Sequence, residues 1–148
     1  MKDNNTSILA VIPARGGSKG IKRKNLRLLN GKPLIYYQIK NALTSKWISD
    51  IVITSDDEEI LEYASNFGVY LRERPPKLAQ DDVTLDPVVY NAMIYMENLL
   101  NKKYDVVITL QPTSPLLKPT TLDRAIEKFF SENLDTLVPV IDATHLYW

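Results

Sequence analysis

The segment Pro13–Asn25, PARGGSKGIKRKN, gathers residue types that bind phosphate. Glycine lets backbone N–H groups approach an oxyanion closely, and three of the chain's five glycines fall here: Gly16, Gly17 and Gly20. Three cationic side chains in the same segment can donate charge-assisted hydrogen bonds: Arg15, Lys19 and Lys24. We interpret Pro13–Asn25 as a phosphate-binding loop. The alternative is a flexible basic surface loop.

The spacing of this loop excludes two familiar phosphate-binding motifs. A Walker A motif needs Gly-Lys followed by Ser or Thr, whereas the order here is Ser18-Lys19-Gly20. A dinucleotide-binding fingerprint needs GxGxxG, and the glycines of this loop are spaced differently. The loop therefore belongs to another kind of phosphate site.

A second polar segment, Leu110–Leu117, reads LQPTSPLL. Its two prolines stiffen it, and its neutral polar side chains offer an amide and two hydroxyls: Gln111, Thr113 and Ser114. Such a loop suits recognition of a polyol or of a sugar that bears an amide. Taken alone, the segment is explained more simply as a proline-rich turn whose hydroxyls cap the next helix.

The elements that position these loops follow from the apolar pattern. Short apolar runs predict strands over 7–13, 50–55, 69–72, 105–110 and 136–140, and helical spacing predicts helices over 33–45, 58–67, 87–100 and about 120–132. Asp86 is the expected N-cap of the third helix. The alternation predicts one α/β domain over residues 1–148, with a doubly wound, mostly parallel sheet and helices on both faces. In one common strand order the first and fourth strands are neighbours and ligands bind at their carboxyl ends, which would bring the two polar loops together.

Charge is unevenly distributed in a chain of 148 residues with a net charge of zero. No acidic residue lies between Asn4 and Ser49, a stretch that holds half of the 18 basic residues. This bias predicts an anionic partner, or else ion pairs formed with residues later in the chain, such as the acidic cluster Asp56–Glu59. The chain has no cysteine, which excludes disulfides, thiolate zinc sites and a cysteine nucleophile, and fits a cytoplasmic location. It also has no apolar run long enough to span a membrane.

Four segments together resemble the acylneuraminate cytidylyltransferases, the CMP-sialic acid synthetases and their relatives for legionaminic and pseudaminic acids. They are IPARGGSKGIKRKN at Ile12–Asn25, ITSDD at Ile53–Asp57, RERPPKLAQDD at Arg72–Asp82 and LQPTSPL at Leu110–Leu116. The resemblance covers nearly the whole chain in the expected order. It implies a Rossmann-like fold of the nucleotide-diphospho-sugar transferase type.

The resemblance also implies site residues. Those that hold CTP would be Arg15, Gly16, Gly17, Ser18, Lys19, Lys24, Asn25 and Arg74. Among these, Arg15 and Lys19 would be catalytic, Asn25 would lie near the ribose and α-phosphate, and Arg74 near the cytosine edge. Spacing alone leaves open that Arg74 is a solvated loop charge. Gln111, Thr113 and Ser114 would lie on the sugar side.

The implied reaction is direct displacement. The anomeric hydroxyl of an acidic nine-carbon sugar attacks the α-phosphorus of CTP, and pyrophosphate leaves. Such transfers depend mainly on positioning and charge neutralisation, which Mg²⁺ would assist. The resemblance implies an aspartate pair for this metal beyond Trp148 and a homodimer for the full-length protein. We therefore expect a chain truncated at its C-terminus that binds CTP but is not fully active by itself.

The chain departs from the family pattern near its end, where Leu146 follows His145 in place of proline. Three other functions remain open: a non-catalytic nucleotide-binding module, a related nucleotidyltransferase for another acidic sugar, and a nucleic-acid binder. Zero net charge and the lack of a stacking aromatic array disfavour nucleic acid, and we expect no membrane partner. The sequence does not distinguish among nonulosonic acids as substrate.

Overall fold

The computed structural model describes residues 5–17 and 23–138. Its centre is a four-stranded sheet in the order β5-β4-β1-β6. These strands are β1 (Ile8–Pro13), β4 (Asp50–Ser55), β5 (Tyr70–Glu73) and β6 (Val106–Thr109). All three pairings are parallel, with Val11 opposite Val52 on one side and Thr109 on the other. The predicted neighbourhood of the first and fourth strands, β1 and β6, is thus confirmed.

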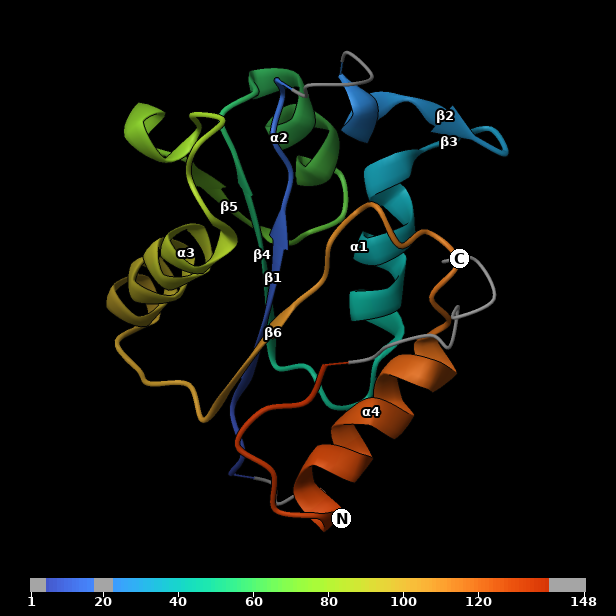
Figure 1. The fold of residues 1–148 in the computed structure, drawn as a ribbon, viewed down its shortest axis with the longest axis vertical. Coiled ribbons are helices and arrows are strands. Elements are labelled where there is room, and N and C mark those ends of the chain that lie inside the picture. The colour runs from blue at the N-terminus through green and yellow to red at the C-terminus, as the bar shows by residue number, and fades with distance from the viewer. Residues whose placement is uncertain (1–4, 18–22, 139–148) are drawn as a thin grey trace, which may run out of the picture.

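Helices cover both faces of the sheet, as the α/β pattern predicts (Figure 1). On one face α1 (Leu34–Thr44), α2 (Glu58–Ser65) and α4 (Pro119–Ser131) pack against Ile8, Ala10 and Ile12 of β1. On the other face α3 (Leu85–Leu100) packs against Leu9 and Val11. All six residues of β1 are buried, which explains why this central strand reads as a continuous apolar run rather than an alternating one.

Several local features differ from the sequence prediction. Helix α3 begins at Leu85 with Thr84 as its N-cap, so Asp86 lies in the first turn and is not the cap. A small antiparallel hairpin joins β2 (Leu28–Leu29) to β3 (Lys32–Pro33). Its turn residues Asn30 and Gly31 have φ of 51° and 80°, the left-handed geometry that an Asn-Gly turn provides. Two short 3₁₀ helices, η1 (Lys24–Leu26) and η2 (Pro76–Leu78), complete the described elements.

The predicted strand at 136–140 is wrong over the residues that the structure describes. Residues 136–138 follow α4 without joining a sheet, and Val138 is 72% exposed. An apolar run forms a strand only where a neighbour accepts its backbone hydrogen bonds, and Pro139, next in sequence, has no N–H to give. Residues 139 and 140 lie outside the described part.

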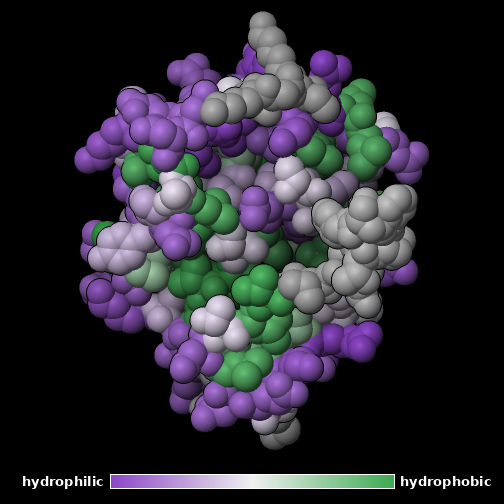
Figure 2. All heavy atoms as spheres, in the orientation of Figure 1, coloured by the Kyte–Doolittle hydropathy of each residue, from purple (hydrophilic) through white to green (hydrophobic). Residues whose placement is uncertain are grey.

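Strand β6 forms one edge of the described sheet, and its four residues are only partly buried. In the space-filling view, apolar side chains gather in the middle of the face on which Figure 1 displays this strand (Figure 2).

No helix among the described residues is long and apolar enough to cross a membrane.

Candidate nucleotide-binding site

The two polar loops begin at the carboxyl ends of neighbouring parallel strands. The backbone continues the sheet pattern a little beyond β1 and β6, because the amide of Ala14 donates to Thr54 O and that of Leu110 to Val11 O. Arg15 and Gly16 therefore leave the sheet at the same end as Gln111, the end at which the parallel strands have their carboxyl termini. Ligands of open α/β sheets bind in the crevice at this end.

Carboxylates on other loops occupy the described donors of the loop after β1. Gly16 N donates to Asp56 Oδ1 at 2.9 Å, and Arg15 Nη1 donates to Asp81 Oδ1 at 2.9 Å. Arg23 donates to both carboxylate oxygens of Asp57. This last pair joins the basic first third to the acidic cluster at 56–59. The alternative of ion pairs with residues later in the chain is confirmed for Arg15, Arg23 and Lys46, which pairs with Glu127. The donors of the loop thus each bind a negatively charged oxygen, and the same types of donor bind phosphate oxygens.

Asn25 fixes the backbone at the base of this loop. Its side chain is 7% exposed, and Nδ2 donates to the carbonyl oxygen of Arg15 at 2.9 Å. The 3₁₀ helix η1 carries both Lys24 and Asn25, and it packs against α1. Two predicted CTP-binding residues, Arg15 and Asn25, are thus in direct contact. Gly17 is exposed, and Ser18 and Lys19 lie outside the described residues.

Arg74 is buried, with 6% of its surface exposed, so the solvated-charge alternative is wrong. Its Nη2 donates to Thr54 O at 3.2 Å, while neither its Nε nor Thr54 Oγ1 has a hydrogen-bond partner among the described residues. Burial lowers the pKa of Arg74; the charge of Asp56 raises it, and that of Arg15 lowers it. A buried cation with an unsatisfied donor at the carboxyl ends of β4 and β5 favours a polar ligand group there.

A buried polar pair on α1 holds the loop after β6. Gln38 is 1% exposed, and its Nε2 donates to the carbonyl oxygens of Gln111 and Ser114 at 2.8 and 3.1 Å. Asn41 is 4% exposed and donates to Gln38 Oε1 at 3.1 Å and to Leu117 O at 2.9 Å. The backbone of this loop is thereby fixed from inside the protein.

This arrangement leaves the predicted sugar-binding side chains at the surface. The side chains of Gln111, Thr113 and Ser114 belong to exposed residues, and no described hydrogen bond makes the two hydroxyls cap α4. The N-cap of α4 is Lys118, which makes no side-chain capping bond, so the helix-capping alternative is wrong. No described hydrogen bond joins this loop to Arg15 or Arg74.

Sequence reasoning missed three residues that organise the site. Gln38 and Asn41 lie on the buried face of an amphipathic helix, where polar residues are unusual. Polar residues at these apolar positions of the helical pattern could have identified them from the sequence. Asp57 was quoted only as part of a motif. Its contact with Arg23 joins residues 34 positions apart, which no local pattern reveals.

The described residues do not provide a metal site. They contain no group of three His, Cys, Asp or Glu side chains that could hold an ion. Asp56 and Asp81, two carboxylates beside the loop after β1, accept hydrogen bonds from Gly16 and Arg15. We therefore assign no protein ligand to Mg²⁺ in this part of the chain.

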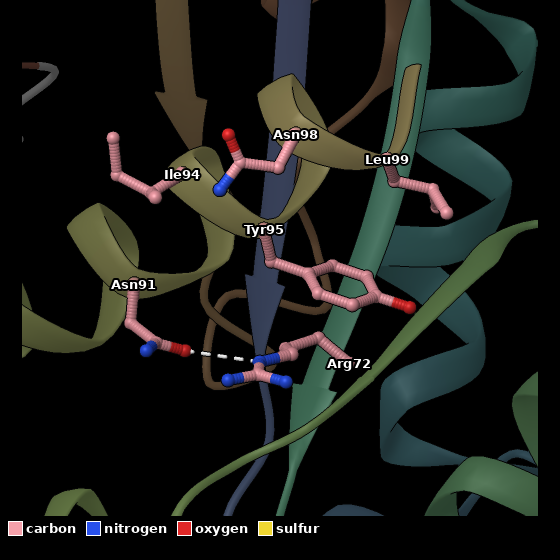
Figure 3. A pocket seen from close by; sticks show the side chains of 6 residues that line it. All are labelled: Arg72, Asn91, Ile94, Tyr95, Asn98 and Leu99. Carbon is pink, nitrogen blue, oxygen red and sulfur yellow. Dashed lines mark hydrogen bonds between the residues drawn. The ribbon is translucent and has the colours of Figure 1, made fainter. Parts of the chain in front are cut away.

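A hollow with a volume of about 390 Å³ lies elsewhere on the described surface, between α3 and β5 (Figure 3). There Arg72 lies over the ring of Tyr95, 4.8 Å from its centre, and its Nε donates to Asn91 at 3.1 Å. None of the predicted site residues lines this hollow. We place the candidate site at the loops after β1 and β6, because the glycines and cations of the first loop and the exposed polar side chains of the second leave the sheet at the carboxyl ends of neighbouring strands.

Comparison with known proteins gives a consistent result. Residues 9–147 match the family model described as cytidylyltransferase. The chain is 44% identical over 124 residues to the pseudaminic acid cytidylyltransferase of Campylobacter jejuni, a match that covers 82% of this chain and 52% of that protein. It is 40% identical over 124 residues to the CMP-N,N'-diacetyllegionaminic acid synthase of Legionella pneumophila, covering 81% of this chain and 52% of that protein.

A solved structure shares the fold. The structure of CMP:2-keto-3-deoxy-manno-octonic acid synthetase complexed with CTP superposes with a TM-score of 0.67 at 20% identity, over 86% of this chain and 49% of that chain. The chain thus spans about half the length of the curated relatives it matches.

Proposed function

Because the chain belongs to the cytidylyltransferase family, we propose that it forms the CTP-binding part of an enzyme that transfers CMP to a sialic-type acid. The acceptor oxygen would be the anomeric hydroxyl of the sugar, and pyrophosphate would leave. The observation that carries this proposal is the convergence of donors at one edge of the sheet. Arg15 and Gly16 follow β1, and the buried Arg74, which follows β5, donates to Ser55 O and Thr54 O at the end of the adjoining strand β4.

The loop after β1 suits the triphosphate. Its described donors, Arg15 Nη1 and Gly16 N, are already oriented toward carboxylate oxygens, which present charge and geometry similar to those of phosphate oxygens. Lys19 and Lys24 would add positive charge, Ser18 a hydroxyl donor, and Gly17 room for close approach. Holding the leaving phosphates in this way favours a transition state in which charge moves toward pyrophosphate.

Arg74 and Asn25 suit the nucleoside end. The side-chain amide of Asn25 donates to the Arg15 carbonyl and so joins the two described ends of the loop. The unsatisfied Nε of Arg74 would gain a partner if a polar atom of the cytosine edge approached it. This assignment makes Arg74 a contributor to base binding rather than to phosphate binding.

The loop after β6 suits the acceptor sugar. Gln111, Thr113 and Ser114 are exposed while their backbone is fixed by Gln38, and a rigid backbone keeps hydrogen-bonding side chains in place. The names of the relatives, which include pseudaminic and legionaminic acids, support an acidic nine-carbon sugar as acceptor. We further propose a homodimer in the cytoplasm for the full-length enzyme, on the family resemblance alone.

Mg²⁺ would neutralise phosphate charge in this reaction. Among the described carboxylates, Asp56, Asp81 and Asp57 bind Gly16, Arg15 and Arg23, so we assign none of these three to the metal. A binding assay is consequently the direct test of the site. We expect the 148-residue chain to bind CTP more tightly than UTP, ATP or cytidine. Equal affinity for all four would contradict the proposal.

Turnover tests the reaction itself. Pyrophosphate release is measured with CTP and, in turn, sialic, legionaminic and pseudaminic acid, with and without magnesium. Release that requires both CTP and one of the sugars supports cytidylyl transfer. CTP binding without release from any sugar supports the alternative of a nucleotide-binding module.

A further inference from the structure

We propose that Asp57 is a positioning residue that holds both ends of the phosphate-binding loop, an inference that rests on the proposed binding of CTP there. Asp57 is the second residue after β4 and directly precedes α2. The start of α2 and the end of β1 lie at the same end of the molecule (Figure 1). Asp57 thus connects a rigid part of the fold to a glycine-rich loop.

The first end of the loop is held by contact. Gly16 N donates to the neighbouring Asp56, and the backbone of Gly16 lies directly against the side chain of Asp57. A Cβ atom at position 16 would come within 2.7 Å of both Cβ and Oδ2 of Asp57. The close approach therefore requires glycine, and it places Asp57 against the point at which the loop leaves β1.

The second end is held by an ion pair. Arg23 Nη2 lies 2.7 and 2.5 Å from the two carboxylate oxygens of Asp57, and Arg23 Nη1 lies 3.0 Å from Glu59 Oε1. Arg23 has a φ of 53°, a left-handed conformation that is unfavourable for a residue with a side chain. An interaction elsewhere must compensate for that conformation, and the pair with Asp57 is the strongest that Arg23 makes.

The carboxylate of Asp57 is itself fixed. Oδ1 accepts the amide of Glu59 at 2.9 Å as the N-cap of α2, the amide of Asp57 donates to Ser55 Oγ at 3.0 Å, and the side chain is only 13% exposed. Gly16 and Arg23 are thus attached to adjacent residues of one rigid turn. The two described ends of the loop, at Gly16 and Arg23, therefore both lie against this turn.

A direct role for Asp57 in binding phosphate is excluded by its charge. If Asp57 acted through charge alone, its neutralisation would raise the affinity for a triphosphate, because a nearby negative charge repels one. If Asp57 positions the loop, neutralisation lowers that affinity. The two roles therefore predict opposite signs.

The test uses Asp57→Asn, because asparagine caps helices as well as aspartate does and only the ion pair is weakened. We expect about a tenfold loss of CTP affinity by calorimetry, with cytidine affinity unchanged within about twofold. In the absence of nucleotide, we expect faster amide hydrogen exchange in the peptide that covers residues 16–26. Glu59→Gln is the matched control, since Glu59 is exposed and contributes only the second contact to Arg23.

Arg23→Met provides an independent arm, because Arg23 lies in a loop and its loss does not disturb the cap of α2. This variant should show the same faster exchange. The CTP affinity of the double variant should be no lower than that of either single variant. Three results would each overturn the inference. They are unchanged amide exchange in both single variants, equal losses of affinity for CTP and cytidine, and a CTP affinity of Asp57→Asn that is unchanged or higher. Failure of the unaltered chain to bind CTP would instead overturn the proposed function, and the exchange measurements would still decide the role of Asp57.

Discussion

Arg15 Nη1 lies 2.9 Å from the carboxylate of Asp81. Arg15 is also a residue that we assign to the triphosphate, so in this structure a carboxylate occupies a donor that CTP would use. Asp81 is well exposed, with 59% of its side chain accessible, so the pair can open without uncovering a buried charge. Nucleotide binding would then exchange one anion for another at Arg15.

The first prediction follows from this exchange. Asp81→Asn should raise CTP affinity by up to about fivefold, because an exposed ion pair is worth about 0–1 kcal/mol and CTP would no longer have to break it. Calorimetry with CTP measures the change. Asp82→Asn is the matched control: it removes the same charge one residue away, at a side chain that makes no described contact with Arg15. Equal effects of the two variants would show that only net charge matters.

The second prediction concerns two adjacent glycines. Gly16→Ala should reduce the free energy of unfolding by about 1–3 kcal/mol, since the added Cβ would lie 2.7 Å from Asp57 and force a backbone shift. Gly17→Ala should change it by less than about 0.5 kcal/mol, because nothing lies within 4 Å of a Cβ there. Urea denaturation compares them. Similar losses for both would mean that the described approach of Gly16 to Asp57 is incorrect.

The third prediction concerns the buried polar pair of α1. Gln38→Leu should destabilise the chain by about 1–3 kcal/mol, because the carbonyl oxygens of Gln111 and Ser114 would lose their buried donor. Lys40→Ala, at an exposed position of the same helix, should have an effect within about 0.5 kcal/mol. Denaturant midpoints provide the comparison. In an active enzyme, Gln38→Leu should also raise the KM for the sugar more than that for CTP; an equal rise would place the loop after β6 outside the sugar site.

The fourth prediction separates the base from the phosphates. Arg74→Met should lower the affinities for CTP and for cytidine by similar factors, because the proposed partner of Arg74 belongs to the cytosine that both ligands share. Measuring both ligands by calorimetry, with far-UV circular dichroism to verify folding, gives the two factors. A loss for CTP with cytidine binding intact would assign Arg74 to the phosphates instead.

The fold was predictable from sequence where local pattern and tertiary context agree. Strand β1 is buried on both faces and reads as an uninterrupted apolar run that ends at Pro13, so both its type and its end could be recognised. Residues 136–138 of the predicted strand at 136–140 had the same apolar character but pair with no described strand, and pairing is not encoded locally. The Asn30-Gly31 hairpin carried a recognisable turn signal that was overlooked among basic residues.

The sequence identified the loops that form the site, but not the side chains that those loops contact. Clustered glycines and cations marked the loop after β1, because close approach to an anion demands those residue types. The partners of that loop could not be foreseen, since Asp57 and Asp81 lie 34 and 66 residues from the arginines they bind. Arg74 was recognised only by resemblance, because burial of an arginine depends on the packing of β4 and β5 around it.

The central claim, that the loop after β1 binds the triphosphate of CTP, is tested most directly by titrating CTP and cytidine into the unaltered chain and into Lys19→Ala. Lys19 lies outside the described residues, and its role rests on the sequence. We predict that the substitution weakens CTP binding by about 1.5–3 kcal/mol and leaves cytidine binding almost unchanged, because the lysine would contact only phosphate oxygens. Equal losses for the two ligands, or an unaltered chain that binds CTP no more tightly than cytidine, would contradict it.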